Sequence, residues 1–343
     1  MFTYRKLTHI DNIINHMKVL VTGGCGFIGH HLVDYILRNT DHDVVVIDKL
    51  SYAAKGLTRL VDTNAIDNQR VQIITWDLCV ELSVGLIDEL SDVDVIVHMA
   101  AETHVDNSID DPIKCIQNNV MSTVHMLEFA RKLPSLKRFL YFSTDEVYGP
   151  ALGDKMYSEW ERHNPTNPYS ASKSAGEGIA LSYHNTYKVP IVICNVMNVF
   201  GERQYVEKYI PSCMKRIMND EVVHIHCYPG CEKAGTRFYI HAQQVANAVM
   251  FLIEKAVIGE KYNITGEQEV DNLELAQMIA FFMGKELKYE MTDFHSTRPG
   301  HDLRYGLDGQ KLSLMGWKPN ISFCETLKGV VEWTMQHIKW LES

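Results

Sequence analysis

Tyr169 and Lys173 have the residue types and the spacing of a catalytic pair, within the segment Tyr169-Ser170-Ala171-Ser172-Lys173. Side chains four positions apart on a helix lie on the same face, one turn from each other. A free tyrosine, with a pKa of about 10, is a poor base at neutral pH, but a neighbouring ammonium group lowers that pKa. Such a tyrosine can take the proton of a hydroxyl while a hydride leaves the same carbon for a nicotinamide. The spacing alone is a weak signal, because it arises by chance on many helices.

A second group of reactive side chains stands at Ser143-Thr144-Asp145-Glu146, directly after the apolar segment 139–142. If that segment is a strand, these hydroxyl and carboxyl groups lie at its carboxyl end. Two neighbouring carboxylates are costly to ionise together, so one proton can be shared between them. This arrangement suits an acid and a base that act in one step. An Asp-Glu pair in a solvated loop is the ordinary alternative, and the neighbouring signals argue against it here.

The segment Thr22–Gly29 has glycines at positions 23, 26 and 29, between a first predicted strand and a helix. In a dinucleotide-binding turn, the first glycine allows the tight turn, the second lets the backbone approach a pyrophosphate, and the third allows close packing of helix and strand. The helix N-terminus then offers free N–H groups and a favourable dipole to the phosphates. We interpret Gly23, Gly26 and Gly29 as such a turn rather than as an ordinary glycine-rich loop.

Asp48 strengthens that interpretation. It ends the second predicted strand about twenty residues after the glycines, where a carboxylate can accept a hydrogen bond from a ribose 2′-hydroxyl. A 2′-phosphate would be repelled at this position, so the sequence favours NAD over NADP as the cofactor. The neighbouring Lys49 weakens this preference slightly.

Short runs rich in Val and Ile alternate with segments of helical period throughout the first half of the chain. The predicted strands contain Val19–Val21, Val44–Ile47, Val71–Ile74, Val93–Val97 and Phe139–Phe142. This alternation indicates βαβ units and a parallel sheet that is covered by helices on both faces. We therefore predict an α/β protein with a Rossmann-type doubly wound parallel sheet.

The pattern changes after about Val196, which suggests a second, smaller α/β domain that is discontinuous in the sequence. The region Gly201–Arg237 is richer in Lys, Pro and isolated aromatic residues, and short strands and helices mix from Asn263 onward. We predict an N-terminal extension at 1–16, an NAD-binding domain at 17–196 and 238–262, and a substrate-binding domain at 197–237 and 263–343. The second domain would cover the carboxyl edge of the sheet, where ligands of open α/β sheets bind.

Composition and charge exclude several classes of partner. The chain has 343 residues, 46% of them hydrophobic, and a formal charge of −10 from 33 basic and 43 acidic residues. Because there is no basic stripe, we expect neither nucleic acid nor a membrane surface as a partner. No apolar run reaches the roughly 20 residues that span a bilayer, and residues 1–16 contain no apolar signal segment. Eight cysteines without the spacing of a disulfide framework indicate reduced thiols and a cytoplasmic protein.

Taken together, these segments resemble the extended short-chain dehydrogenase/reductase superfamily, and within it the dTDP-glucose 4,6-dehydratases and the related UDP-glucose enzymes. The resemblance runs from Met17 to nearly the end of the chain. Besides the glycine turn, it includes the motifs Ile47–Ala53, Met99–Asp106, Ser143–Gly149, Pro168–Lys173, Glu207–Pro211 and Arg298–Asp302. It implies a tightly bound NAD, and a nucleotide sugar held by the smaller domain.

The resemblance also implies a role for each reactive residue. Thr144 would hydrogen-bond O4 of the sugar, and Tyr169, assisted by Lys173, would deprotonate O4 while C4 passes a hydride to NAD. The new C4 ketone acidifies the C5 hydrogen, which Glu146 would remove while Asp145 protonates the departing C6 hydroxyl. The hydride then returns to C6, so the product is a 4-keto-6-deoxy sugar nucleotide and NAD is not consumed.

Two sets of binding residues follow from the same resemblance. Besides the three glycines, Asp48, Tyr169 and Lys173, the cofactor site would contain Phe27, Ile28, Lys49, Ser51, Asp77, Leu78, Met99, Ala100, Ala101, Thr103 and Asn118. The nucleotide sugar would be held by Thr103, Asn198, Lys208, Tyr209, His226, Arg237, Asn263, Arg298 and His301. Arg237 and Arg298 would clamp the diphosphate, because a guanidinium group matches phosphate geometry in a bidentate manner.

Two departures from the family pattern leave the nucleobase open. Val199 stands where the bacterial enzymes usually carry a second Asn near the cofactor. The segment His224–Cys231 replaces a shorter turn near the base, and His226 resembles the plant UDP-glucose enzymes more than the bacterial dTDP enzymes. The sequence therefore does not decide between dTDP-glucose and UDP-glucose. The two His and two Cys of this segment do not have a standard structural zinc spacing, so we predict no metal site.

Other activities share part of this pattern. UDP-hexose 4-epimerases and UDP-glucuronate decarboxylases would keep the glycine turn, Tyr169 and Lys173. Neither reaction needs an acid that expels a C6 hydroxyl, so Asp145 favours the dehydratase. An NAD-binding redox sensor without turnover is an alternative of another class, but such proteins typically lose the Tyr or the Lys.

The resemblance finally implies an oligomeric state. Helices predicted at Pro112–Lys132 and Pro168–Tyr187 match those that form a four-helix bundle between two subunits in this superfamily. We therefore predict a homodimer. Whether the product feeds rhamnose or amino-deoxysugar synthesis is open.

Overall fold

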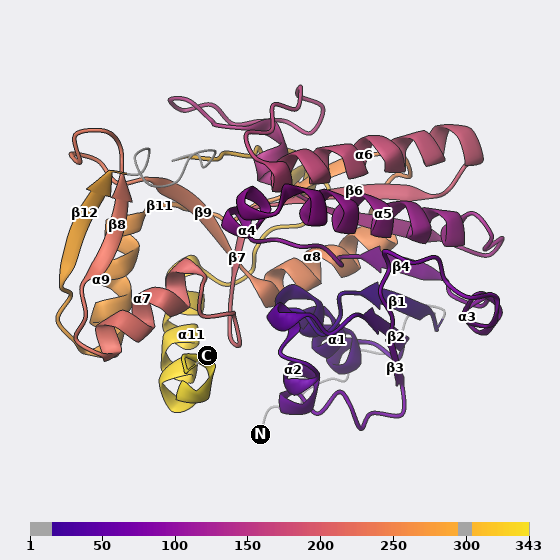
Figure 1. Cartoon of the computed structure of the whole chain (residues 1–343), viewed down its shortest axis with the longest axis horizontal. Coiled ribbons are helices and arrows are strands. Elements are labelled where there is room, and N and C mark those ends of the chain that lie inside the picture. Colours follow the sequence, from indigo (N-terminus) through magenta and orange to yellow (C-terminus); the bar gives the residue numbers. More distant parts are fainter. Residues whose placement is uncertain (1–15, 294–303, 343) are drawn as a thin grey trace, which may run out of the picture.

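A seven-stranded parallel sheet is the largest element of the fold (Figure 1). The computed structural model describes residues 16–293 and 304–342. The strand order is β10-β6-β5-β4-β1-β2-β3, which confirms the predicted Rossmann-type doubly wound sheet. The strands are β1 (Lys18–Thr22), β2 (Asp43–Asp48), β3 (Val71–Thr75), β4 (Val95–His98), β5 (Arg138–Thr144), β6 (Ile191–Val196) and β10 (Lys261–Ile264).

The strands of this sheet are buried on both faces, because successive side chains point to opposite sides. In β1, Val19 and Val21 belong to the core on one side of the sheet, and Leu20 belongs to the core on the other side. This explains why the strands are continuous apolar runs in the sequence. The predicted start of the fourth strand at Val93 is wrong, because the N–H of Val93 donates to the carbonyl of Leu90 in the preceding turn.

Helices cover the two faces of the sheet (Figure 1). On one side α1 (Phe27–Asn39) contacts α8 (Ala242–Lys255), and on the other α5 (Pro112–Ala130) packs along α6 (Pro168–Tyr187). The two helices predicted at 112–132 and 168–187 are therefore present, and the first ends at Ala130. Shorter connecting helices are η1 (Tyr52–Ala54), α2 (Thr58–Asp62), α3 (Val84–Glu89), α4 (Val105–Asp110) and η2 (Asp145–Tyr148).

A second group of elements has its own hydrophobic core, which contains Ile210, Ile225 and Leu275. Its strands form a three-stranded sheet, β11 (Glu269–Asp271), β9 (Thr236–His241) and β7 (Asn198–Phe200), and a parallel pair, β8 (Val223–Cys227) and β12 (Tyr289–Asp293). Its helices are α7 (Tyr209–Met218), α9 (Asn272–Met283), α11 (Phe323–Gln336) and η3 (Ile338–Trp340). Helix α10 (Gln310–Leu314) instead contacts β10, and its Leu312 belongs to the core of the large sheet. The domain limits predicted at 237/238 and 262/263 fall inside β9 and β10, and the division into two domains stays a prediction.

The length and hydropathy of the helices bear on whether any of them could span a membrane. Within residues 16–293 and 304–342, no helix combines the length and the apolar character needed to cross a membrane.

Close packing of α6 on the sheet depends on Gly176. A Cβ atom on Gly176 would lie 2.0 Å from the hydroxyl oxygen of the buried Tyr141 in β5, whereas one on Gly178 would meet nothing within 4 Å. We expect Gly176→Ala to destabilise the protein by about 1–3 kcal/mol through overpacking. Gly178→Ala, the control on the same helix, should be neutral or stabilising by up to about 1 kcal/mol. Urea unfolding measures both, and equal stabilities would contradict this packing.

Candidate active site

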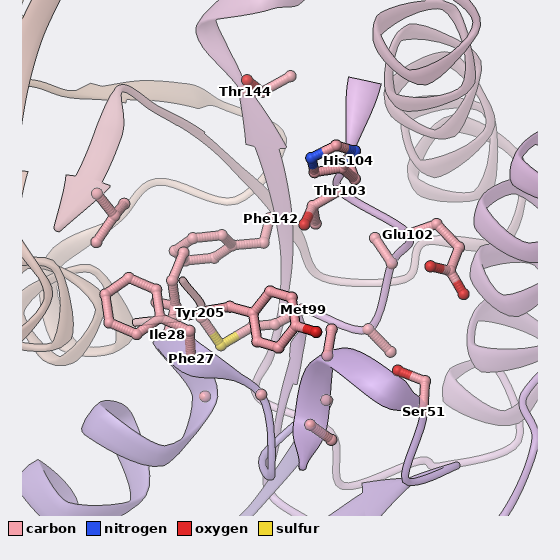
Figure 2. A pocket seen from close by; sticks show the side chains of 18 of the residues that line it. Phe27, Ile28, Ser51, Met99, Glu102, Thr103, His104, Phe142, Thr144 and Tyr205 are labelled. Atoms are coloured by element: carbon pink, nitrogen blue, oxygen red, sulfur yellow. The ribbon is translucent and has the colours of Figure 1, made fainter. Parts of the chain in front are cut away.

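A cavity of about 370 Å³ opens at the carboxyl edge of the large sheet, where β1, β4, β5 and β6 end (Figure 2). It lies beside the point between β1 and β4 from which the strand order runs in opposite directions, the usual ligand position in such sheets. Its walls include the loop after β1, the start of α6 and residues 204–210. Every residue predicted for the cofactor site and for catalysis lines this cavity.

The glycine turn brings the backbone of β1, β4 and α1 into close contact. Gly23 has a φ of +71°, and a Cβ atom there would lie 3.0 Å from the backbone N and Cα of Ala100. A Cβ on Gly29 would lie 2.2 Å from the carbonyl oxygen of Gly23. The N-cap of α1 is Gly26, which has no side chain to occupy the first N–H groups of the helix. The turn therefore fits a pyrophosphate, as expected for a dinucleotide site.

Asp48 ties this turn to the end of β2. Its Oδ2 accepts a hydrogen bond from the N–H of Cys25 at 3.0 Å, and its Oδ1 accepts one from the N–H of Leu50 at 2.8 Å. Lys49 points its charge elsewhere: its Nζ donates to Asn118 Oδ1 at 2.5 Å and lies 3.2 Å from Glu102. Lys49 therefore makes its ion pair with Glu102 and acts on Asp48 only as a more distant charge, and the carboxyl at this position agrees with a ribose 2′-hydroxyl rather than a 2′-phosphate.

The end of β5 places the hydroxyl and carboxyl groups side by side. Thr144 Oγ1 donates to Asp145 Oδ1 at 2.9 Å and accepts from the N–H of Glu146 at 3.4 Å. Glu146 Oε2 accepts from Asn167 Nδ2 at 3.2 Å and from the hydroxyl of Tyr305 at 3.5 Å. The adjacent acidic residues are thus held by different partners.

Burial favours the protonated form of Asp145. Asp145 is 4% exposed, and its Oδ2 has no hydrogen-bond partner among the described residues. Burial, and then the charge of Glu146, raise the pKa of Asp145 to about 7. Near neutral pH, Asp145 therefore retains a proton for a substantial part of the time, and it can serve as an acid beside the carboxylate of Glu146.

Helix α6 begins at a position that local residues determine. Asn167 Oδ1 accepts from the N–H of Ser170 at 2.8 Å, and Ser170 Oγ accepts from the N–H of Asn167 at 3.2 Å. This capping box precedes Pro168, whose missing N–H costs nothing in the first turn. Tyr169 and Lys173 then follow on the buried face of the helix, 8% and 4% exposed.

The protonation of this pair differs from the prediction made from its spacing. Burial lowers the pKa of Lys173 to about 8, and Glu177 opposes that fall. Burial, and then Glu146, raise the pKa of Tyr169 well above its ordinary value, and a hydrogen bond with Thr144 opposes that rise. Lys173 is not among the groups that shift the pKa of Tyr169, and desolvation of the phenolate is the largest effect, so the predicted lowering of this pKa is wrong for the protein by itself.

Four of the residues predicted to hold the nucleotide sugar line the cavity, namely Thr103, Asn198, Lys208 and Tyr209. Lys208 Nζ donates to the carbonyl of Thr103 at 3.4 Å, and the hydroxyl of Tyr209 donates to the carbonyl of Asn272 at 2.6 Å. The Nδ2 of Asn198 is buried and has no partner among the described residues. Buried amides normally have partners, so Asn198 is a donor suited to a bound ligand.

Asn263 is not in the wall of this cavity. It is 1% exposed in β10, and its Nδ2 donates to the carbonyls of Tyr157 and Asp308, each at 3.0 Å. The amide therefore joins two loops, and its predicted contact with the nucleotide sugar finds no support in this placement.

His226 in β8 and Arg237 in β9 also lie outside the wall. The charge of Arg237 nevertheless opposes the rise in the pKa of Asp145, so Arg237 is near the catalytic end of the cavity. Arg298 and His301 lie outside the described residues, and their predicted contacts stay predictions.

Several residues outside the predicted site also line the cavity, among them Tyr52, Glu102, His104, Tyr205 and Glu207. Figure 2 shows Glu102, His104 and Tyr205 in this position. All but Tyr205 belong to motifs quoted above, at 47–53, 99–106 and 207–211, so those motifs were an available signal. The rings of Tyr52 and Tyr205 meet edge to face with centroids 5.7 Å apart. Tyr205 stands in no recognisable pattern, and only the fold brings it here.

The segment His224–Cys231 contains two His and two Cys residues, in β8 and the turn that follows it. In the part of the chain that the structure describes, no three His, Cys, Asp or Glu side chains converge as metal ligands would. The Sγ atoms of Cys227 and Cys231 lie 2.7 Å apart.

A doubly wound parallel sheet, a glycine turn with Asp48 at the ribose position, and a buried Tyr–Lys pair together define a Rossmann-fold dehydrogenase of the short-chain type. Within this class, the family described as GDP-mannose 4,6 dehydratase matches residues 20–330. The chain belongs to that family.

Individual relatives share most of the chain. A dTDP-glucose 4,6-dehydratase of Shigella flexneri is 33% identical, and the alignment covers 95% of each chain. A trifunctional UDP-glucose 4,6-dehydratase of Arabidopsis thaliana, which also carries epimerase and reductase activities, is 32% identical over 96% of this chain and 49% of its own length. The relatives therefore include both dTDP-glucose and UDP-glucose enzymes.

Solved structures share the fold closely. A dTDP-glucose 4,6-dehydratase from Streptomyces venezuelae with NAD bound has a TM-score of 0.84 and 31% identity, over 95% of this chain and 99% of its own. A UDP-glucuronic acid 4-epimerase from Bacillus cereus, in complex with UDP-glucuronic acid and NAD, has the same TM-score of 0.84 at 28% identity, over 94% and 100%. The fold alone therefore does not separate dehydratases from epimerases.

The glycine turn leads to a test of cofactor binding. A Cβ on Gly29 would force the backbone at Gly23 away from α1, so Gly29→Ala should reduce the NAD retained through purification at least about tenfold. Gly85→Ala is the matched control in a helix, because a Cβ there meets nothing within 4 Å. Nucleotide released on denaturation and measured by absorbance checks this, and full NAD occupancy in Gly29→Ala would contradict the assigned turn.

Proposed function

We propose that this chain is an NAD-dependent nucleotide-sugar 4,6-dehydratase that converts dTDP-glucose or UDP-glucose to the 4-keto-6-deoxy sugar nucleotide and water. The observation that carries the proposal is Asp145, a buried carboxyl whose pKa is raised to about 7, beside Glu146 in the cavity that also holds Tyr169 and Lys173. The family and the dehydratase relatives described above support it. NAD, when bound, accepts a hydride from the sugar and later gives it back.

Thr144, Tyr169 and Lys173 act on the sugar hydroxyl. Thr144 shares a hydrogen bond with Tyr169, so the two hydroxyl groups can meet the same sugar oxygen. The buried phenol is neutral near pH 7, and a charged group close to it favours loss of its proton. Lys173 supplies that charge from one helical turn away, and it remains largely protonated at neutral pH, because its pKa is about 8.

Asp145 and Glu146 act on the neighbouring carbons. A carboxylate can remove a proton that an adjacent ketone has acidified, and a protonated carboxyl can donate to a departing hydroxyl. The hydrogen bonds to Glu146 from Asn167 and Tyr305 favour its charged form, whereas burial favours the protonated form of Asp145. The base and the acid are therefore assigned by their surroundings, in the same way as in other carboxyl pairs.

The epimerase alternative has specific support, because the Bacillus cereus enzyme matches this fold as well as the Streptomyces enzyme does. The decarboxylase has the same need for Tyr169 and Lys173. Neither epimerisation nor decarboxylation has an evident need for a carboxyl group that is protonated near pH 7, as Asp145 is. Formation of UDP-glucose from UDP-galactose, without a 4-keto product, would favour the epimerase.

We propose that residues of the second group of elements determine which nucleobase is accepted. We infer that Asn198, Lys208 and Tyr209 contact the nucleotide sugar, because they line the cavity, and that Arg237 reaches it from β9. Parallel assays with dTDP-glucose and UDP-glucose, with water loss detected by mass spectrometry, test the reaction and the base preference together. An absence of turnover with both, despite bound NAD, would refute the proposed function.

We also propose a cytoplasmic homodimer. The outer surface of α4 and α5 exposes Ile109, Ile113, Ile116 and Met121, and α5 lies alongside α6. Apolar side chains gathered on adjacent helices suit a subunit interface. The eight cysteines are free thiols, which suits a reducing compartment. A monomer mass in light scattering at micromolar concentration would contradict the dimer, and secretion of the native protein would contradict the location.

Replacement of Asp145 should separate the two halves of the reaction. We expect Asp145→Asn to slow water loss by about 10²–10⁴-fold, the usual contribution of a general acid, and to slow C4 oxidation by less than about tenfold. In the unmodified enzyme, water loss should fall as the pH rises through about 7, because Asp145 then loses its proton. The variant should lack that limb of the pH profile.

The readouts are water loss by mass spectrometry and the absorbance of reduced nicotinamide in a single turnover. Asp154→Asn is the control, because Asp154 is exposed in the loop that follows η2. If both steps fell equally in Asp145→Asn, Asp145 would not be a dedicated acid.

A further inference from the structure

A buried ion pair lies behind the reacting groups, outside the cavity. Glu177 on α6 and Lys261 on β10 have side chains that are 1% and 3% exposed, and Lys261 Nζ lies 2.7 Å from Glu177 Oε2. Neither residue lines the cavity or takes part in the steps proposed above. Removing two charges from water is costly, and apolar residues of similar volume often replace such pairs without loss of stability. A buried pair of this kind is therefore weak evidence for a role in stability, and another role can be sought in what its two side chains contact.

The second oxygen of Glu177 holds the ends of two strands. Glu177 Oε1 accepts from Ser143 Oγ at 2.5 Å and from Asn195 Nδ2 at 2.7 Å. Ser143 in β5 pairs with Asn195 in β6 and directly precedes Thr144 and Asp145. Asn195 Nδ2 also lies 3.4 Å from the carbonyl oxygen of Thr144. The carboxylate of Glu177 thus fixes, from behind, the strand end that presents the acid to the cavity.

Glu177 also lies one helical turn after Lys173, on the same buried face of α6. Burial lowers the pKa of Lys173 to about 8, and Glu177 is foremost among the groups that oppose this fall. Lys261 is not among the groups that shift it. Without the charge of Glu177, the ammonium group of Lys173 would lose its proton at a lower pH.

The titratable groups that face Glu177 come from every element packed around it. They are Tyr141 on β5, Tyr148 on η2, His163 before α6, Lys173 on α6, Cys194 on β6 and Lys261 on β10. Burial, and then the charge of Glu177, raise the pKa values of Tyr141, Tyr148 and Cys194, so these groups stay protonated. Burial lowers the pKa of His163, so it stays neutral near pH 7. Lys173 is the group near the cavity whose charge depends on Glu177.

We propose that Glu177 is a positioning residue of this active site, which fixes the end of β5 through Ser143 and supplies the negative charge that keeps Lys173 protonated. The inference rests on the proposed function, because a charged Lys173 matters only if Tyr169 takes a proton from the substrate. Glu177 touches neither the cavity nor the reacting atoms, so its effects pass through Ser143 and Lys173.

The charge of Glu177 can be removed while its shape is kept. In the double variant Glu177→Gln with Lys261→Met, the amide oxygen can still accept from Ser143 and Asn195, and no unpaired buried ammonium is left. The rate of C4 oxidation, followed by the absorbance of reduced nicotinamide in a single turnover, avoids the step that needs Asp145. At high pH the rate of C4 oxidation falls as Lys173 loses its proton, and we call this part of the pH profile the basic limb. We expect the basic limb to shift to lower pH, so that the rate above pH 8 falls about tenfold for a shift of one unit. Below the shifted limb, the rate should equal that of the unmodified enzyme.

Ser143→Ala is the matched variant for the anchoring role, because it removes the hydrogen bond and leaves the charge of Glu177. It should lower the rate of water loss several-fold at every pH without moving the basic limb of C4 oxidation. A merely structural role of Glu177 would lower the melting temperature of both variants and leave both pH profiles unchanged. An unshifted limb in the double variant therefore overturns the charge role, and an unchanged rate in Ser143→Ala overturns the anchoring role.

Glu177→Asp keeps the proposal open to test if the double variant does not fold. The shorter side chain keeps the charge on the same turn and loses its reach to Ser143, so it should behave like Ser143→Ala. A shifted basic limb, or a rate of water loss equal to that of the unmodified enzyme, would overturn the proposal. Failure of the proposed function is distinguishable, because the unmodified enzyme itself would then show no turnover of either glucose nucleotide.

Discussion

Asp145, Tyr169 and Lys173 are almost entirely withdrawn from water, and the free-energy cost of charging a group in such a place decides which of them holds a proton. The same cost acts in opposite directions on acids and on bases. It raises the pKa values of the carboxyl and the phenol and lowers that of the ammonium group. The pKa values of Asp145 and Lys173 are thereby brought closer to neutrality, whereas Tyr169 is kept as a neutral phenol.

This desolvation depends on how the sheet is built. Parallel strands carry their polar ends to one edge, and residues 204, 205 and 207–210, at the start of the second group of elements, supply another part of the cavity wall. Glycines at positions 23 and 29 allow α1 to approach that edge without side chains in between. Glu177, the carboxylate one helical turn from Lys173, is placed behind the wall of the cavity rather than in it. The site can therefore be dry enough to shift pKa values and still have room for ligands.

Most of the central architecture could be predicted from the sequence, because its signals are local. The limits of α6 follow from Asn167 and Pro168 at its start, and the strands of the sheet follow from runs of β-branched residues. The start of β4 was misplaced because Val93 is as apolar as the strand itself. Its N–H bonds to the carbonyl of Leu90 in a turn, so Val93 does not join the hydrogen bonds of the sheet.

Features that depend on distant packing could not be predicted. Whether Asn263 meets a ligand or two loops depends on which way its side chain points in β10, and the same is true of His226 in β8. Spacing suggested that Lys173 would lower the pKa of Tyr169, but spacing contains no information about burial. Tyr205 reaches the cavity from a segment that has no pattern at all.

The position of β10 has a consequence for synthesis of the protein. β6 pairs with β5 on one side and with β10 on the other, yet residues 197–260 leave the ribosome between them. During this interval β6 is an apolar edge strand with unpaired N–H and C=O groups, which is the kind of surface that draws other chains into aggregates. The carboxylate of Glu177 also lacks its ion-pair partner until Lys261 has been synthesised. The nascent enzyme is therefore most in need of protection by a chaperone after its catalytic residues have been made and before its sheet is complete.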